Sequence, residues 1–198
     1  NLLLGSINSK IILNIAIYII IAGIINVMLY KNSEYQSQID FVELAKQLPE
    51  YKFVWFGYTN LNTVPLKIRE AVETKLENLY FPGYVSREDL RDAYLGSDLF
   101  LFLTHEETEG IVLLEAMAAK TPTLIRDIPI YEGWFIDGKN VYKGKTFEEF
   151  KNKISGILEN KLSSTVEEGY KIAEERDIKN IGKELIKVYE KLLEEVKN

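Results

Sequence analysis

The chain has 198 residues, of which 46% are apolar, with a formal net charge of −6, a pI of about 5.1 and no cysteine. This length can bury one sizeable core, and the acidic balance argues against nucleic acid as a partner, because phosphate neutralisation needs clustered Lys and Arg. The lack of cysteine excludes disulfide and thiolate chemistry and suits a reducing compartment. Neither a metal-binding spacing of the HExxH type nor a glycine-rich Walker or GxGxxG loop occurs, so we expect no metal site.

Residues 1–34 form a segment apart, rich in Ile and Asn, and residues 11–29 contain only two asparagines as polar side chains. Their length and composition satisfy the threshold for a transmembrane helix. We favour a buried strand and helix instead, because β-branched Ile dominates and a parallel sheet needs an opening strand just before Ile39. This interpretation predicts a protein that needs no detergent. A membrane segment and an artefactual sequence stay open as alternatives, whereas a signal peptide would need a small-residue cleavage site.

In residues 35–198, patterns typical of strands and helices alternate. The strand patterns are short, apolar and rich in aromatic or β-branched residues, and lie at 53–56, 79–81, 98–103, 123–125 and 140–142. The helical patterns begin at Ile39, cover 65–77 and 86–96, follow Gly110, and fill most of the chain from 146 to 196. Helix starts are indicated by three capping-box patterns, at Ser86–Asp89, Thr146–Glu149 and Ser164–Glu167.

This alternation predicts an α/β fold: a Rossmann-like parallel sheet with helices on both faces. In such folds ligands bind beyond the carboxyl ends of the strands. The loop after strand 98–103 therefore lies at the edge where a ligand is expected.

That loop and the helix after it carry the most informative pattern of the chain. Glu106, Glu107 and Glu109 crowd the loop before Gly110, and Glu115 stands alone in the apolar run that follows. A helix that is apolar all round is expected to be buried, and an ionised carboxylate inside it is costly unless it is hydrogen-bonded. Since no nearby residue in the sequence can serve, we expect ligand hydroxyls to be the partners of Glu115. Glu107 is expected to face the same cleft.

A simpler explanation exists for some of these residues. Acidic side chains before a helix often only complement its macrodipole, by about 0.3–1 kcal/mol each. That suffices for Glu106 and is adequate for Glu109, but it is weaker for Glu107 and fails for Glu115. His105 is the only histidine. We expect it to be a loop or packing residue, with a contact to a donor phosphate or sugar as the alternative.

The motif resembles the signature of the retaining glycosyltransferases of the GT-B fold (family 4): two glutamates separated by seven residues, a glycine between them, and Glu-Ala at the second. Residues 97–104 resemble the strand before that signature, and residues 121–144 resemble the bacterial branch that glucosylates diacylglycerol. The likeness runs roughly from Ile39 to the C-terminus. It implies the C-terminal, donor-binding half of a GT-B enzyme.

The resemblance also implies roles for individual residues. Glu107 would be the catalytic-site residue that contacts the donor sugar, and Glu115 would bind the ribose of the nucleotide. The backbone around Gly83 and Tyr84 would border the base, although strand-end packing is an equal alternative for Tyr84. The remaining donor contacts would fall on Thr108, Glu109, Gly110 and Leu114.

Two departures from the family pattern bear on donor binding. The family has basic residues for the donor diphosphate just before the helix, where this chain has 34–37 (EYQS). Diphosphate binding would then rest on the helix N-terminus after Gly110, or on Lys10, Lys31 or Arg126 folding over that position. In addition, Thr108-Glu109 replaces the glycine-phenylalanine pair common after the first glutamate.

The expected function is therefore that of a nucleotide-sugar-binding domain of a retaining hexosyltransferase. The resemblance implies UDP-glucose as donor, no metal or other cofactor, and a lipid or glycan acceptor. The partner domain for the acceptor is expected to be missing from this chain, which leaves the activity of the isolated chain open. We expect a cytoplasmic protein that reaches the membrane surface through its acceptor. The alternative is a non-catalytic binding or regulatory module that kept the fold and lost its basic residues.

Overall fold

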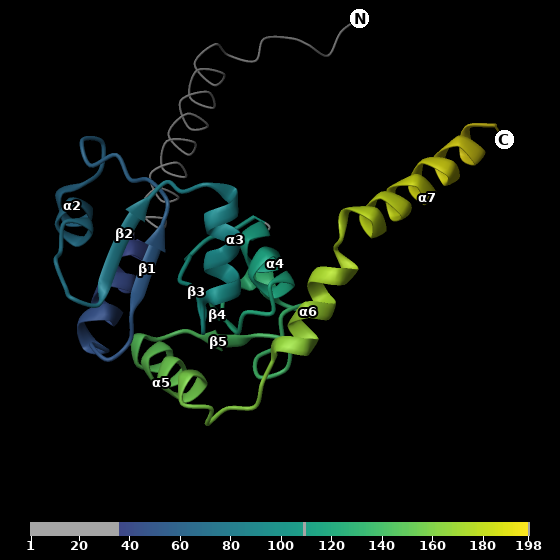
Figure 1. Ribbon diagram of the computed structural model, residues 1–198. Coiled ribbons are helices and arrows are strands. Elements are labelled where there is room, and N and C mark those ends of the chain that lie inside the picture. Colours follow the sequence, from purple (N-terminus) through teal and green to yellow (C-terminus); the bar gives the residue numbers. More distant parts are fainter. Residues whose placement is uncertain (1–35, 109, 198) are drawn as a thin grey trace, which may run out of the picture.

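The computed structural model describes residues 36–108 and 110–197 (Figure 1). A helix covers residues 36–47 and is followed by β1 (Phe53–Phe56), α2 (Leu66–Val72), β2 (Leu79–Gly83), α3 (Arg87–Gly96), β3 (Phe100–Phe102), α4 (Ile111–Ala118), β4 (Thr123–Arg126), the 3-10 helix η1 (Pro129–Tyr131), β5 (Tyr142–Gly144), α5 (Phe147–Leu158), α6 (Val166–Glu175) and α7 (Ile178–Lys197). The predictions for residues 1–34 lie outside these ranges. Among the described helices, none has both the length and the apolar character needed to cross a membrane.

All strand pairs of the described residues are parallel, as predicted. β1 pairs with β2, and β4 lies between β3 and β5. The sequence predicted one sheet, whereas the described residues form two, one of two strands and one of three. The opening strand expected before Ile39 is not found at 36–38, because these residues are already helical and the helix starts earlier than predicted.

The three-stranded sheet is covered on both faces, which confirms the predicted layering. Successive side chains of a strand point to opposite faces. Leu124 of β4 accordingly packs into one core cluster, with helix 36–47, β1 and α5, while Ile125 packs into a second cluster with α4 and η1. Both side chains are fully buried. Burial on both faces explains why the centre of this strand, Leu124-Ile125, is apolar without alternation.

One side chain ties helix 36–47 to β2. The amide nitrogen of Asn78, just before β2, donates hydrogen bonds to the backbone carbonyls of Ala45 (2.9 Å), Leu48 (3.2 Å) and Tyr51 (3.0 Å). Buried carbonyls at a helix end need such partners. These bonds hold the segment just before β2 in place. The helix α2 ends at Val72, earlier than the predicted helix end at residue 77.

Of the three capping boxes, one is complete. Thr146 and Glu149 satisfy each other's backbone N–H groups at the start of α5. The Ser86 hydroxyl accepts a hydrogen bond from the backbone N–H of Asp89 and donates one to the Asp89 carboxylate. In a complete capping box the backbone N–H of Ser86 would donate to that carboxylate instead. The box predicted at Ser164–Glu167 is wrong: the N-cap of α6 is Thr165, whose side chain makes no cap bond, while the Ser164 hydroxyl accepts a hydrogen bond from the N–H of Val166 at 3.3 Å.

A close backbone approach fixes α6 against the segment before β5. A Cβ atom at Gly169 would lie 2.8 Å from the carbonyl oxygen of Asn140, a distance that no methyl group tolerates. We expect Gly169→Ala to destabilise the protein by about 1–3 kcal/mol, as overpacking does, despite the better helix propensity of alanine. Urea unfolding measures this change.

Gly182→Ala is the matched control. Gly182 also lies inside a helix, α7, but a Cβ there meets nothing within 4 Å. This variant should be as stable as the parent or more stable. Equal unfolding midpoints for both variants would show that the Gly169 approach does not constrain the fold.

Candidate functional site at the start of α4

The turn from β3 into α4 depends on Gly110. This residue is the N-cap of α4 and adopts left-handed backbone angles, φ 73° and ψ 49°. A Cβ atom here would lie 3.0 Å from Leu113 Cδ1 and 3.2 Å from the Tyr131 hydroxyl oxygen. Both strain and crowding therefore require glycine. The first backbone N–H groups of α4 follow directly, and an N-terminal turn leaves such groups without helical acceptors.

Glu107 is half-buried and folds back on its own loop. Its Oε1 accepts a hydrogen bond from the backbone N–H of Thr108 at 2.8 Å and lies 3.5 Å from the Thr108 hydroxyl. Thr108 itself is exposed. Glu109 lies outside the described residues. The carboxylate of Glu107 is thus held by its own loop, three residues before the N-cap of α4, and its contact with a sugar stays a prediction.

The prediction that α4 is buried all round is wrong. The helix buries one face and leaves Ile111, Glu115 and Ala118 exposed, because residues three or four apart share a face. Leu114 is half-buried. Ile111 is 60% exposed, so apolar composition does not by itself identify a helix without a solvent face.

Glu115 also has a protein partner that the sequence did not reveal. The hydroxyl of Tyr94, on α3, donates a hydrogen bond to Glu115 Oε2 at 3.1 Å. Burial and then the charge of Glu115 raise the pKa of Tyr94, so the phenol stays a donor at neutral pH. An exposed carboxylate with a fixed donor on one oxygen keeps further acceptor positions for a ligand.

The two residues predicted to border a base lie at the end of β2. Gly83 has a positive φ of 77°. Tyr84 is 88% exposed, so the interpretation as a strand-end packing residue is wrong. Its contact with a base stays a prediction.

Arg126 joins the strand ends at this edge of the sheet. Its guanidinium donates to Asp40 Oδ2 at 2.6 Å, to the carbonyl of Leu103 at 3.1 Å and to the carbonyl of Lys145 at 3.2 Å. His105 Nε2 lies 3.0 Å from the same Asp40 oxygen. Helix 36–47, the loop after β3, and the ends of β4 and β5 thus meet at one cation.

This network bears on whether Arg126 can bind a donor diphosphate. Its side chain is only 12% exposed, and burial lowers the pKa of its guanidinium while Asp40 opposes that change. The guanidinium uses three of its five N–H groups to bind Asp40 and the two carbonyls, so the structure shows Arg126 in a structural role. Lys10 and Lys31, the other two basic candidates, lie outside the described residues.

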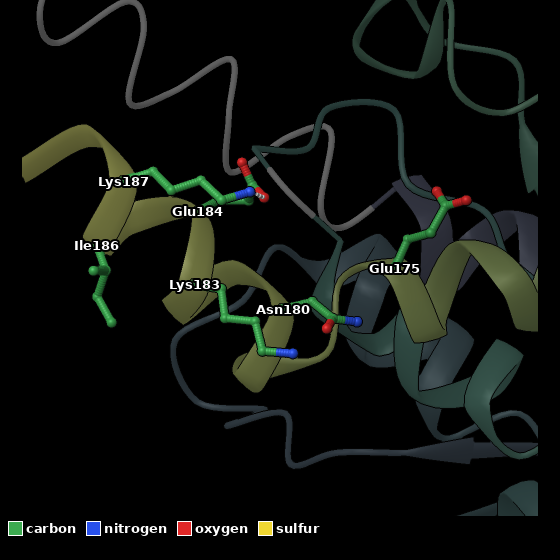
Figure 2. A pocket seen from close by; sticks show the side chains of 6 residues that line it. All are labelled: Glu175, Asn180, Lys183, Glu184, Ile186 and Lys187. Carbon is green, nitrogen blue, oxygen red and sulfur yellow. Dashed lines mark hydrogen bonds and ion pairs between the residues drawn. The ribbon is translucent and has the colours of Figure 1, made fainter. Parts of the chain in front are cut away.

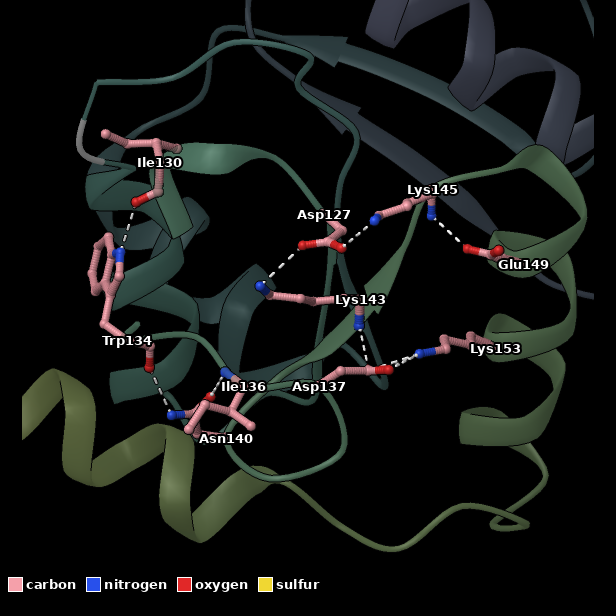
Figure 3. A network of polar contacts seen from close by, with 10 residues as sticks. All are labelled: Asp127, Ile130, Trp134, Ile136, Asp137, Asn140, Lys143, Lys145, Glu149 and Lys153. Carbon is pink, nitrogen blue, oxygen red and sulfur yellow. Dashed lines mark hydrogen bonds and ion pairs between the residues drawn. The ribbon is translucent and has the colours of Figure 1, made fainter. Parts of the chain in front are cut away.

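The segment between β4 and β5 is fixed by a second polar network (Figure 3). Asp127 bridges Lys143 and Lys145 at 3.1 and 3.2 Å, and the hydrogen bond from Lys143 is the first cause that lowers the pKa of Asp127. Farther along, Asn140 binds the backbone N–H of Ile136 and the carbonyl of Trp134. Hydrogen bonds and ion pairs therefore hold the segment between β4 and β5 at both of these points.

Two surface cavities lie away from Glu107 and Glu115. One of about 540 Å³ is formed by the end of α6 and by α7, and is lined by Glu175, Asn180, Lys183, Glu184, Ile186 and Lys187 (Figure 2). The other, of about 360 Å³, is lined by residues 58–62 with Arg69 and Glu73. Neither cavity is lined by Glu107, by Glu115 or by any other residue of α4.

We expect Asp40→Asn to destabilise the protein by roughly 1.5–3 kcal/mol, because it removes the charged acceptor of a buried guanidinium. The matched control is Asp92→Asn, which removes the carboxylate of an exposed pair with Arg91 and should change stability by less than about 1 kcal/mol. Thermal or urea unfolding measures both. If the two variants unfold alike, Arg126 does not hold the strand ends together.

The family model for glycosyl transferases group 1 matches residues 26–194. A processive diacylglycerol α-glucosyltransferase of Acholeplasma laidlawii is 38% identical over 154 residues, which cover 78% of this chain and 46% of that protein. An α-galactosylglucosyldiacylglycerol synthase of Streptococcus pneumoniae is 33% identical over 96 residues, covering 47% and 26%. The chain thus spans less than half the length of these relatives.

Solved structures share the fold. The pneumococcal O-GlcNAc transferase GtfA, in complex with UDP and GlcNAc, matches with a TM-score of 0.58 at 22% identity, over 81% of this chain and 33% of that one. The C-terminal domain of a Francisella tularensis glycosyl transferase (LpcC) matches with a TM-score of 0.57 at 18% identity, over 73% and 80%. These matches confirm the Rossmann-like fold of GT-B glycosyltransferases.

Proposed function

The chain belongs to the family of group 1 glycosyl transferases, and on that premise we propose that it is the nucleotide-sugar-binding domain of a retaining hexosyltransferase. The donor is UDP-glucose, and the acceptor is a lipid or a glycan presented by a partner domain. The observation that carries this proposal is the arrangement at the start of α4: Glu107 before, and Glu115 after, a helix N-terminus that is opened by the left-handed Gly110.

The relatives support the donor and the acceptor class. Two of them are named for glucosyl transfer to, or extension of, a diacylglycerol lipid. UDP occupies the GtfA structure and a cyanobacterial relative of the same fold. A lipid acceptor would bring the protein to the cytoplasmic face of a membrane.

Each part of the site has a chemical role in this proposal. Glu115 accepts hydrogen bonds from ribose hydroxyls beside the bond from Tyr94, and Glu107 accepts them from the hexose. The diphosphate binds, in this proposal, against the N–H groups at the start of α4, whose fixed dipoles would stabilise the charge that it develops as the leaving group. No residue role in the proposal requires a metal ion.

One observation favours the alternative, a non-catalytic module. Arg126 is engaged by Asp40 and by two carbonyls, so it does not supply the positive charge that the sequence lacks at 34–37. The two functions differ in donor binding. A domain of the transferase binds UDP-glucose, whereas a module without donor binding does not.

We expect Glu115→Gln to weaken UDP binding about tenfold or more, equivalent to about 1.4 kcal/mol, because charged hydrogen bonds to the ribose are lost. Stability should be unchanged, since Glu115 is exposed and glutamine still accepts from Tyr94. Calorimetric titration with UDP measures the affinity.

Glu107→Gln should act differently: UDP-glucose binds more weakly, while UDP binds as to the parent, because the partner of Glu107 is the sugar. Glu106→Gln is the matched control, with the same charge change one residue earlier on an exposed side chain, and should leave both affinities unchanged. If Glu107→Gln and Glu115→Gln both bind UDP and UDP-glucose like the parent, the carboxylates are only helix-end charges and the proposed site is wrong.

A further inference from the structure

Tyr131, the last residue of η1, carries a polar group that the fold does not use. Its side chain has no exposed surface. Its hydroxyl is buried and makes no hydrogen bond with the described residues. Burying an unpaired hydroxyl costs free energy, so a phenylalanine would serve better if packing were the only task of this position.

The hydroxyl lies at the donor site. A Cβ atom on Gly110 would sit 3.2 Å from it, so the oxygen lies against the N-cap of α4. After burial, the negative charge of Glu107 is the second cause that raises the pKa of Tyr131. The phenol is therefore protonated at neutral pH, and the charge of the Glu107 carboxylate acts on it.

The ring cannot easily turn away to find another partner. It packs edge-on against Trp134 and Phe135, with ring centroids 6.0 and 5.2 Å away. The Trp134 side chain is itself fixed by a hydrogen bond from its ring N–H to the carbonyl of Ile130 at 2.8 Å, as Figure 3 shows. The hydroxyl direction is thus set by the scaffold before any ligand arrives.

We propose that Tyr131 is a donor-positioning residue, whose hydroxyl donates a hydrogen bond to the Glu107 carboxylate when that carboxylate holds the hexose of the nucleotide sugar. This inference rests on the proposed function. In the free protein Glu107 folds onto Thr108. A carboxylate has about four acceptor positions, so it can accept from Thr108, from Tyr131 and from a sugar hydroxyl together. Tyr131 then fixes the direction in which Glu107 meets the hexose.

This arrangement predicts opposite effects on folding and on binding. Tyr131→Phe removes only the hydroxyl. Free protein loses an unpaired buried group, so its unfolding midpoint should equal or exceed that of the parent, by up to about 2–4 °C. UDP-glucose should bind about tenfold more weakly, whereas UDP, which has no hexose, should bind unchanged.

Tyr142→Phe is the matched control. Tyr142 is also a buried tyrosine, but its hydroxyl donates to the carbonyl of Ser163 at 2.7 Å, away from α4. Its loss should lower the unfolding midpoint and leave both affinities unchanged. The two variants therefore separate a hydroxyl kept for a ligand from one that stabilises the fold.

The experiment titrates the parent, Tyr131→Phe, Tyr142→Phe and Tyr131→Phe/Glu107→Gln with UDP and UDP-glucose, and records each unfolding midpoint. In the Glu107→Gln background, Tyr131→Phe should add no further loss of affinity, because it acts through Glu107. Additive losses, equal losses for UDP and UDP-glucose, parent-like binding of UDP-glucose by Tyr131→Phe, or a lowered midpoint for Tyr131→Phe each overturn the inference. A parent that binds neither ligand overturns the proposed function and this inference together.

Discussion

The ion pair between Arg126 and Asp40 is the interaction on which the ligand edge of this domain depends. Parallel strands end at this edge with carbonyls that no further strand satisfies, and Arg126 binds those of Leu103 and Lys145. Asp40 compensates the buried guanidinium and anchors helix 36–47. Without the pair, the end of β3 that leads into the Glu107 loop would keep the hydrogen bond from the Ser37 hydroxyl to the Leu103 carbonyl but lose its tie to the ends of β4 and β5 through Arg126.

The same interaction explains why the proposed site differs from a phosphate site lined by cations. The one described arginine at the strand ends is used for structure, so the proposed function assigns anion binding to the backbone at the start of α4. Gly110 opens that helix in a left-handed conformation, and Tyr131 lies beneath it. The site is therefore built from a helix N-terminus, two carboxylates and two tyrosines, Tyr94 and Tyr131, rather than from clustered cations.

Much of the fold followed from the sequence because its local patterns agree with its tertiary structure. The apolar run of β3 and the apolar centre of β4 both form parallel strands, with β4 buried on two faces and β3 half-buried. The exposure of Glu115 could not be predicted, since local composition does not show which face of α4 meets the sheet. Contacts across long sequence distances were also missed: Asp40 with Arg126, and Tyr94 with Glu115, are set by topology. For Arg126 the sequence offered one indication of a role at the strand ends, its position directly after the predicted strand 123–125.

The central claim is that a nucleotide sugar binds at the start of α4. Hydrogen–deuterium exchange with and without UDP-glucose tests it directly, because bound ligand slows the exchange of the amides that it contacts. Protection of residues 104–119, together with the end of β2 at 81–85, is the predicted result. Protection confined to the cavity of α6 and α7, or no protection at saturating UDP-glucose, would contradict the account.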